Sequence, residues 1–423
     1  MTAIPDHLPK RLAITLWDFS WYARTGPGEP FADLDAAFAR AVDLGYNAVR
    51  ICAMPFLLFR SGLDTTALAL EPLGGEFGSR VRWYDMRQST VIDAKAHLLE
   101  FFRAAERHGV SVIASSWEYQ QSPALAADRA WYDALHAVDP EKRLTVLGEA
   151  MADLVDFLTE HGLERTLAFV EPHNEVQIGY LTEGLPGAED AVVELRDRLE
   201  AGIAAFQARH PEVLCAPNYG GVPVASMRGL PRNATALALH PYVYGVLDDL
   251  VREFELRGDP ADFPQERADE ELLRPGAPRL AEWTVPAGSE WKLRASIMKR
   301  VEVYVHDWCD PEKFDRWLYE RYGAHRFAMA AQLRDWIGVA ADHAARLGIP
   351  LVFGEGWVGY TPRDCRFEEG PVGAQICRDA AGHAARVGAW GSICCSNAAP
   401  QHPMWADEDL QRECNAIIRG SER

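Results

Sequence analysis

Basic side chains are scarce in this 423-residue chain. It carries 43 lysines and arginines against 62 aspartates and glutamates, which gives a formal net charge of −19. Phosphate binding needs clustered lysine and arginine, so this balance argues against nucleic acid and against anionic membrane surfaces as partners. The chain also lacks any run of about 20 apolar residues, so we expect no membrane-spanning helix.

The N-terminus lacks the apolar stretch of a secretion signal. Residues 1–11 are largely polar and contain Pro5 and Pro9, which favours a cytoplasmic protein. The eight cysteines include no CxxC pair, so we expect buried free thiols in a reducing compartment. Cys394 and Cys395 are adjacent on a predicted strand, where their side chains would point to opposite faces.

Short apolar runs alternate with longer segments of helical periodicity, a pattern that predicts a parallel sheet. The predicted strands cover residues 12–17, 48–52, 110–115, 167–170, 213–217, 236–239, 351–353 and 389–395. The predicted helices cover residues 33–44, 92–107, 144–159, 191–208, 327–346 and 374–385. Hydrophobic residues make up 48% of the chain, which is enough for a large buried core.

Eight strands favour an α/β fold of the (β/α)₈ TIM-barrel type. The main alternative is a doubly wound open sheet, which carries a glycine-rich phosphate turn after its first strand. That turn is missing here, because Trp17-Asp18-Phe19-Ser20-Trp21 occupies its place. Barrels of this type take about 250 residues and exceed about 400 with insertions. The length therefore fits one decorated barrel.

Two long segments interrupt the alternation. Residues 53–91 follow the second predicted strand, and residues 241–326 follow the sixth. Both come after the carboxyl ends of strands, the face on which barrel enzymes place their active sites. We predict one catalytic barrel over residues 1–423, with residues 243–326 as an insertion at the barrel mouth. A separate small domain is the alternative for this segment.

Two glutamates stand directly beyond predicted strands. Phe169-Val170-Glu171-Pro172-His173-Asn174-Glu175 leaves the fourth strand, and Leu351-Val352-Phe353-Gly354-Glu355-Gly356-Trp357 leaves the seventh. Buried charges are costly, so carboxylates in these places need a functional reason. Such a pair suits glycoside hydrolysis, in which one carboxylic acid protonates the departing oxygen. The other attacks the anomeric carbon in retaining enzymes or activates water in inverting ones.

These motifs resemble clan A of the glycoside hydrolases, the retaining cellulase-like barrels. The pattern Glu-x-x-Asn-Glu, present as Glu171 to Glu175, is frequent in family-5 members of that clan. The segment from Asn47 to Ile51 is similar to the second strand that carries a supporting arginine. His240-Pro241-Tyr242 is similar to the His-x-Tyr at the end of strand six. The resemblance spans residues 12–397 and is nearest to the sugar-binding cellulase-like proteins.

The resemblance implies a role for each matching residue. Glu175 corresponds to the acid/base and Glu355 to the nucleophile, while Asn174 would bind the sugar 2-hydroxyl. The remaining implied residues are two hydrogen-bond partners of Glu355 and one residue lining the sugar site, namely Arg50, Tyr242 and His240.

The chain also departs from the family pattern at three places. Val176 follows the Asn-Glu pair where many relatives have proline, and Ser116-Trp117-Glu118 ends the third strand without the histidine common in family 5. The eighth strand leaves through Ser396-Asn397-Ala398, without the usual tryptophan. Further sugar contacts are expected at or beyond strand ends, although core packing is the alternative for the aromatic residues: Trp17, Trp117, Glu118, Trp357, Asn397 and Trp405.

The function predicted from these residues is that of a retaining glycoside hydrolase cleaving a β-linked glycoside, acting from the end of an oligosaccharide or glycoconjugate. The alternative is a non-catalytic carbohydrate-binding protein on the same barrel. An unrelated isomerase or aldolase would need a strand-end lysine or a metal cluster, and neither is evident. His306, Asp307 and Cys309 match no ligand set, so we expect no metal and no cofactor. The sequence leaves the sugar and the oligomeric state open.

Overall fold

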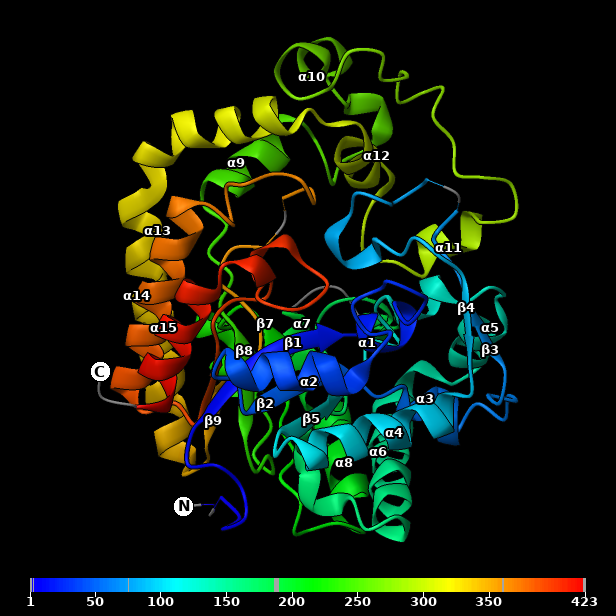
Figure 1. The fold of residues 1–423 in the computed structure, drawn as a ribbon, viewed down its shortest axis with the longest axis vertical. Coiled ribbons are helices and arrows are strands. Elements are labelled where there is room, and N and C mark those ends of the chain that lie inside the picture. Colours follow the sequence, from blue (N-terminus) through cyan, green and yellow to red (C-terminus); the bar gives the residue numbers. More distant parts are fainter. Residues whose placement is uncertain (1, 3, 75, 186–189, 360, 421–423) are drawn as a thin grey trace.

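The computed structural model describes residues 2, 4–74, 76–185, 190–359 and 361–420 (Figure 1). Eight parallel strands form one sheet in the order β6-β5-β2-β1-β10-β9-β8-β7. A parallel bridge from Val170 of β6 to Cys215 joins the two ends of this order, and Val170 exchanges backbone hydrogen bonds with Leu214 and Ala216. The sheet is therefore closed, and the predicted (β/α)₈ barrel is confirmed.

The barrel strands are short and buried on both faces, as expected for a parallel sheet covered by helices. They are β1 (Leu12–Asp18), β2 (Ala48–Cys52), β5 (Ser111–Ser115), β6 (Leu167–Val170), β7 (Asn218–Gly220), β8 (Leu237–His240), β9 (Leu351–Phe353) and β10 (Gly391–Ile393). The prediction of a strand at 213–217 was wrong in extent. Regular pairing begins at Asn218, because Pro217 has no backbone N–H with which to extend the ladder.

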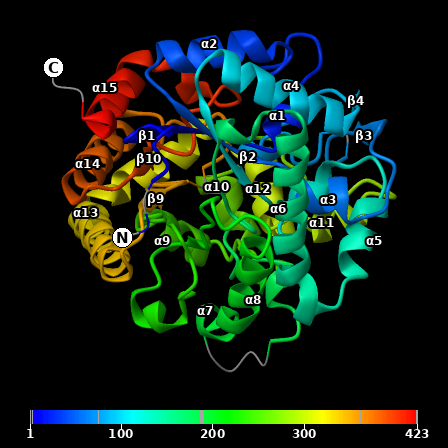
Figure 2. The ribbon, with the colours of Figure 1, turned by 90° about the horizontal axis from the view of Figure 1, so that it is seen from below.

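Helices surround the barrel (Figure 2). Those that follow barrel strands are α1 (Ser20–Ala23), α2 (Leu34–Asp43), α3 (Pro55–Phe59), α4 (Ala94–Arg107), α5 (Ala130–His136), α6 (Arg143–Glu160), α7 (Ala191–Glu194), α8 (Arg196–Gln207), α14 (Pro371–Val387) and α15 (Glu408–Arg419). Asp33 and Asp93 begin α2 and α4 by accepting a hydrogen bond from the backbone three residues later. A left-handed Gly388 ends α14.

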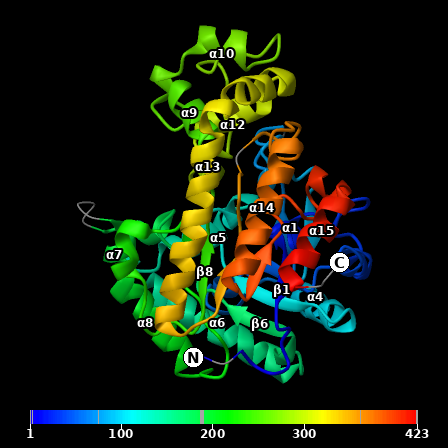
Figure 3. The same ribbon diagram turned by 90° about the vertical axis from the view of Figure 1, so that its left-hand side faces the viewer.

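A large insertion follows β8, as predicted. Its helices are α9 (Val246–Glu253), α10 (Gln265–Glu271), α11 (Glu290–Arg294), α12 (Arg300–Trp308) and the first part of α13 (Pro311–Leu347). Figure 3 shows α13 running from the barrel wall, beside α14, up to α9 and α10. The expected start of this helix at residue 327 was therefore wrong. Asp310 and Pro311 give an N-cap and N1 signal that places the start earlier.

The segment after β2 adds a small antiparallel hairpin, β3 (Leu68–Leu70) with β4 (Thr90–Ile92), which the sequence analysis did not anticipate. This hairpin lies at the edge of the barrel near α5 (Figure 1). Within the described part of the chain, no helix is long and apolar enough to cross a membrane.

Two glycines allow α6 and α8 to pack with their backbones nearly in contact. A Cβ atom on Gly148 of α6 would lie 2.0 Å from the carbonyl oxygen of Gly202 of α8. A Cβ atom on Gly202 would lie 2.4 Å from the carbonyl oxygen of Leu144. Backbone atoms cannot yield as flexible side chains do, so the barrel wall at this place depends on the absence of side chains.

Gly148→Ala is therefore expected to lower the free energy of unfolding by at least about 1–3 kcal/mol, the usual cost of overpacking. The matched control is Gly338→Ala on α13, where an added Cβ meets no atom within 4 Å. That change removes helix-interior glycine and should stabilise the protein by about 0.5–1 kcal/mol. Urea unfolding of both variants measures the difference. Equal effects of the two substitutions would contradict the packing described here.

Candidate active site

A cavity of about 520 Å³ lies at the carboxyl ends of the barrel strands. Its volume is in the range of small-molecule sites. The barrel lines it with Leu16, Asp18, Trp117, Asn174, Glu175, Tyr242, Glu355, Ser396 and Asn397, among others. The insertion lines it with Arg257, Ile297, Met298, Lys299 and Glu302, and the later part of α13 adds Trp336.

Glu175 is held in this cavity by its backbone as well as by its side chain. Its φ angle of 41° is in the left-handed region, where a non-glycine residue is strained and is found mainly at functional sites. The Glu175 N–H donates to Oδ1 of Asn218 at 2.8 Å, which fixes that conformation from β7. Gly220 leaves room for the carboxyl group, since a Cβ there would lie 3.0 Å from it.

Glu355 lies two residues beyond β9 and is 8% exposed. Arg50 Nη1 donates to one of its carboxylate oxygens at 2.7 Å, and the Tyr242 hydroxyl donates to the other at 2.8 Å. These two donors, one on each oxygen, fix the orientation of the carboxylate in the cavity. Gly354 allows the approach, since a Cβ there would meet His240 and Arg50 at 3.1–3.2 Å.

The two carboxylates face each other across His240. One oxygen of Glu175, one oxygen of Glu355 and a ring nitrogen of His240 all lie within 4.8 Å of one another. Nδ1 of His240 is 3.0 Å from Glu175 and 3.7 Å from Glu355. Residues from β6, β8 and β9 that are far apart in the chain are therefore brought to one place in the cavity.

The hydrogen-bond network fixes the tautomer of His240. The Asn218 amide oxygen accepts from the backbone of Glu175, so the Asn218 nitrogen is the group facing His240 Nε2, at 2.9 Å. An amide nitrogen only donates, so Nε2 is the acceptor and Nδ1 carries the proton. Burial lowers the pKa of His240 to about 4, which keeps the ring neutral. His240 therefore donates its Nδ1 proton to Glu175.

Arg50 is fully buried beneath the two carboxylates. Its Nε and Nη2 donate to Glu171 at 2.9 and 2.6 Å, and Nη2 also donates to Asn174 at 2.7 Å. Its guanidinium group lies over the Trp117 ring, 4.5 Å from the centroid. Burial alone would lower the pKa of Arg50, but Glu171 and Glu355 outweigh burial and raise it. Arg50 is therefore a permanent cation joining β2, β6 and β9.

Glu175 is in a different electrostatic position from Glu355. It has no direct contact with Arg50 among the hydrogen bonds of the described residues, and it accepts only from His240 and from Gln120 at 3.2 Å. Burial raises the pKa of Glu175 to about 7. One arginine faces three buried carboxyl groups, so a proton on Glu175 relieves the excess negative charge.

Several predicted sugar contacts lie at the cavity. Trp117, Asn174 and Asn397 line it, together with Glu175, Tyr242 and Glu355, while Arg50 and His240 lie immediately behind this lining. The Asn174 amide oxygen accepts from Arg50, and its nitrogen donates to Gln120 at 2.8 Å. Asn397 donates to Glu368 at 2.7 Å.

Four other predicted contacts are not among the described residues that line the cavity. Trp17 packs outside the barrel against Phe38 and Phe101, because alternation along β1 directs it away from Leu16 and Asp18. Glu118 accepts backbone hydrogen bonds at the start of α3 and one from a buried tryptophan.

The remaining two are also packing residues. Trp357 is fully buried and donates to the carbonyl oxygen of Cys394 at 2.7 Å. Trp405 stacks on Tyr46, with ring centroids 5.8 Å apart. His173 of the same motif as Glu175 is a buried residue whose ring nitrogen accepts a hydrogen bond from the Tyr119 backbone at 3.0 Å.

Sequence reasoning missed three residues that shape the site. Asn218 orients both Glu175 and His240, and Gln120 contacts Glu175 and Asn174. Asp18 lines the cavity with a φ angle of 41°, and burial raises its pKa to about 7. Asp18 ends the first strand, so its position alone was the available signal. Nothing in the local sequence marks Asn218 or Gln120.

The buried ion pair between Arg50 and Glu171 generates a stability prediction. Glu171→Ala leaves the guanidinium buried with fewer partners and should lower the free energy of unfolding by about 3–5 kcal/mol. The control is Asp133→Ala, which removes an exposed helical partner of Arg129 and should leave the unfolding midpoint unchanged. Chemical denaturation distinguishes the two. If Glu171→Ala changes the free energy of unfolding as little as the control does, the buried charge of Arg50 does not need Glu171 as its partner.

Comparison with known proteins agrees with this architecture. Residues 14–137 match the family model described as sugar-binding cellulase-like. The match covers Arg50 and Trp117 but neither Glu175 nor Glu355. No curated protein matches the chain.

Solved structures give a match over the whole barrel. A protein from Parabacteroides distasonis, provisionally named a glycoside hydrolase, is 18% identical with a TM-score of 0.65, over 98% of this chain and 95% of that one. An endo-β-1,4-mannanase from Thermotoga petrophila is 12% identical with a TM-score of 0.49, over 98% and 78%. The predicted resemblance is confirmed over the first three barrel strands, which match the sugar-binding cellulase-like family model, and the chain as a whole shares the barrel fold of the Parabacteroides distasonis protein.

Proposed function

We propose that this protein is a retaining glycoside hydrolase that cleaves a β-linked glycoside. The observation that carries the proposal is the pair of carboxylates, Glu175 and Glu355, with oxygens within 4.8 Å in one cavity. Carboxyl groups about 5–5.5 Å apart suit retention, whereas inversion needs about 6.5–9.5 Å to admit a water molecule. The family match and the barrel fold support the same class of reaction.

Glu175 is the proposed acid/base. With its pKa raised to about 7, a large fraction of Glu175 is protonated at neutral pH, and the acid can give its proton to the glycosidic oxygen as the bond to the anomeric carbon breaks. The neutral His240 and Gln120 donate to this carboxyl group, so they orient it without adding charge. After the first step, Glu175 is ionised and can take a proton from the incoming water.

Glu355 is the proposed nucleophile. Arg50 and Tyr242 hold its two oxygens from opposite sides, which fixes the direction from which one lone pair meets the anomeric carbon. A covalent glycosyl–enzyme forms as the leaving group departs with the proton from Glu175. Water activated by Glu175 then displaces Glu355 and restores both carboxyl groups. Asn174, fixed by Arg50 and Gln120, is the proposed contact of the sugar 2-hydroxyl.

We further propose exo action on an oligosaccharide or glycoconjugate. The insertion lines the cavity with Lys299 and Glu302, and the barrel lines it with residues such as Trp117 and Asp18. A cavity of about 520 Å³ that is walled by both the barrel and the insertion suits the end of a chain better than its middle. The eight free cysteines are compatible with the proposed cytoplasmic location, since thiols persist in reducing compartments.

The first test separates the two carboxylate roles on aryl β-glycosides of different sugars. Glu175→Ala should slow turnover by about 10²–10⁴-fold, because no base activates water for the second step. A good leaving group needs little protonation, so the glycosyl–enzyme should still form and accumulate. Azide needs no base and should restore turnover, giving a β-glycosyl azide. Product analysis by NMR measures the anomeric configuration.

Glu355→Ala is the matched variant, and azide should not restore a retained product there. Retained β-glycosyl azide from Glu355→Ala, together with inverted α-glycosyl azide from Glu175→Ala, would reverse the two roles. If Glu175→Gln and Glu355→Gln both bind sugar and the wild type turns over no aryl glycoside, the protein is a carbohydrate-binding protein instead. Isothermal calorimetry on the Gln variants reads binding independently of turnover.

The second test is the pH dependence of kcat/KM. Because the acid must be protonated and its pKa is raised to about 7, activity should be retained below pH 7 and lost above it. The alkaline limb should disappear in Glu175→Gln, measured on a substrate with a good leaving group. Asp18→Asn is the control, since the pKa of Asp18 is also raised to about 7. If the alkaline limb disappears in Asp18→Asn but persists in Glu175→Gln, the limb reports the titration of Asp18, and Glu175 is not the acid.

A further inference from the structure

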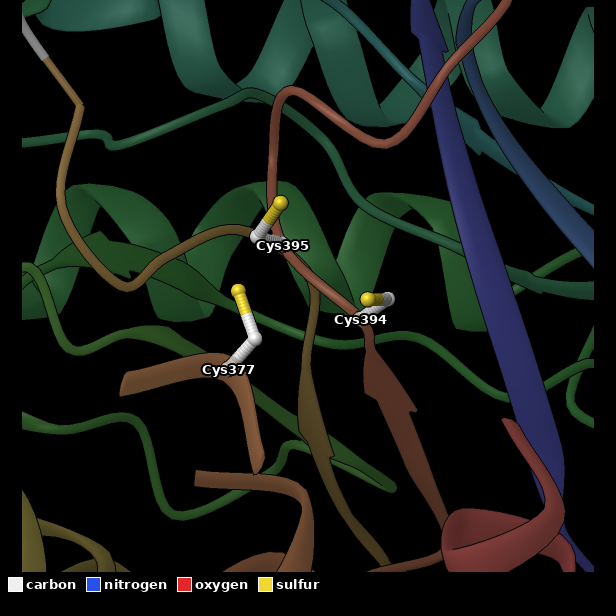
Figure 4. Close-up of side chains that lie close together, drawn as sticks. All are labelled: Cys377, Cys394 and Cys395. Atoms are coloured by element: carbon white, nitrogen blue, oxygen red, sulfur yellow. The ribbon is translucent and has the colours of Figure 1, made fainter. Parts of the chain in front are cut away.

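Three cysteines meet on the outer side of the barrel, away from the two carboxylates. Cys377 belongs to α14, and Cys394 and Cys395 follow β10 (Figure 4). Their three sulfur atoms all lie within 4.8 Å of one another. The expectation that Cys394 and Cys395 face opposite ways was wrong, because β10 ends at Ile393 and strand alternation does not extend beyond it.

Further sulfur atoms adjoin this thiol cluster, by which we mean Cys377, Cys394 and Cys395. The thioether sulfur of Met404 is 2.9 Å from the sulfur of Cys395, and Cys414 of α15 interacts with Cys394. All these side chains are at most 5% exposed. A small cavity of about 10 Å³ borders Cys377 and Cys395, which is about the space of one water molecule or ion.

We propose that the thiol cluster is a binding site for one thiophilic cation, Zn²⁺ or Cu⁺. Thiolate and thioether sulfur select these ions, whereas Mg²⁺ and Ca²⁺ require oxygen ligands. Three sulfurs from two separate segments already converge, so binding needs little rearrangement of the chain. Cys414 and Met404 are the available sources of a fourth ligand, which tetrahedral Zn²⁺ requires.

Binding changes the protonation of the cluster. Each thiol that binds the cation releases one proton to solvent and becomes a thiolate ligand, so binding is weaker at low pH.

The cluster adjoins the proposed active site through the chain itself. Cys395 is followed by Ser396, whose hydroxyl contacts the Tyr242 hydroxyl at 2.7 Å and accepts from the Gly356 backbone at 3.0 Å. A bound cation would hold the exit of β10 from the side opposite the cavity. We therefore expect binding to raise the thermal unfolding midpoint of the protein.

The test uses the full chain, reduced and stripped of metal under anaerobic conditions. Zn²⁺ and Cu⁺ are added separately, the bound metal is measured by mass spectrometry, and Co²⁺ serves as a probe because thiolate ligands give it a charge-transfer absorption. We expect about one equivalent of Zn²⁺ or Cu⁺ per chain, with a raised unfolding midpoint. Cys377→Ala and Cys395→Ala should each weaken binding at least tenfold.

Cys215→Ala is the matched control, since it removes an equally buried thiol outside the cluster. It should bind metal as the wild type does. Circular dichroism and the midpoint of the metal-free variants show that they are folded. The proposal is overturned if neither ion binds the wild type, if Cys215→Ala loses binding equally, or if mass mapping of the untreated protein shows a disulfide within the cluster. Each result is independent of glycosidase activity.

Discussion

The buried guanidinium of Arg50 is the constraint on which the site depends. A cation without solvent at the centre of the barrel must be matched by carboxylates, and it obtains them from Glu171 and Glu355. These partners lie beyond β6 and β9, so one charge fixes the ends of three strands relative to one another. The Trp117 ring covers the guanidinium and excludes water from it. Removing this charge would leave two carboxylates buried together without compensation.

Glu175 and Glu355 differ in their contacts with the guanidinium group of Arg50. Arg50 contacts Glu355 directly, whereas Glu175 meets only uncharged donors. Burial without a cationic partner in direct contact raises the pKa of Glu175 to about 7, as the acid of the proposed double displacement requires. The ring of His240 lies between the two carboxyl groups and is neutral, because burial lowers its pKa to about 4. Asn218 determines which of the two ring nitrogens carries the proton. The side chain of Asn218 on β7 thus orients both Glu175 and His240 without carrying a charge of its own.

The sequence alone predicts the location of site residues that stand at or just beyond the ends of strands. Arg50, Glu175 and Glu355 could be predicted to converge, because parallel strands in a barrel deliver their carboxyl ends to one face. The predicted sugar contact of Trp17 was wrong, because Trp17 lies inside β1. Successive side chains along this strand point in turn to the cavity and to the surrounding helices, and Trp17 points to the helices. The predicted sugar contact of Glu118 was also wrong. Its carboxylate accepts hydrogen bonds from backbone N–H groups at the start of α3, and the sequence does not indicate that this segment lies beside it.

The insertion bears on specificity because it is not independent of the barrel. α13 continues without interruption from the insertion to the barrel wall, and Trp336 of this helix lines the cavity. This wall of the cavity belongs to one continuous helix, and the packing of α13 on α14 holds it in place. The helix has no break at residue 326, where the insertion joins the barrel. A polysaccharide threaded through the site would have to pass this wall on one side. A chain end need not do so, and the wall formed by α13 therefore supports the exo action proposed above.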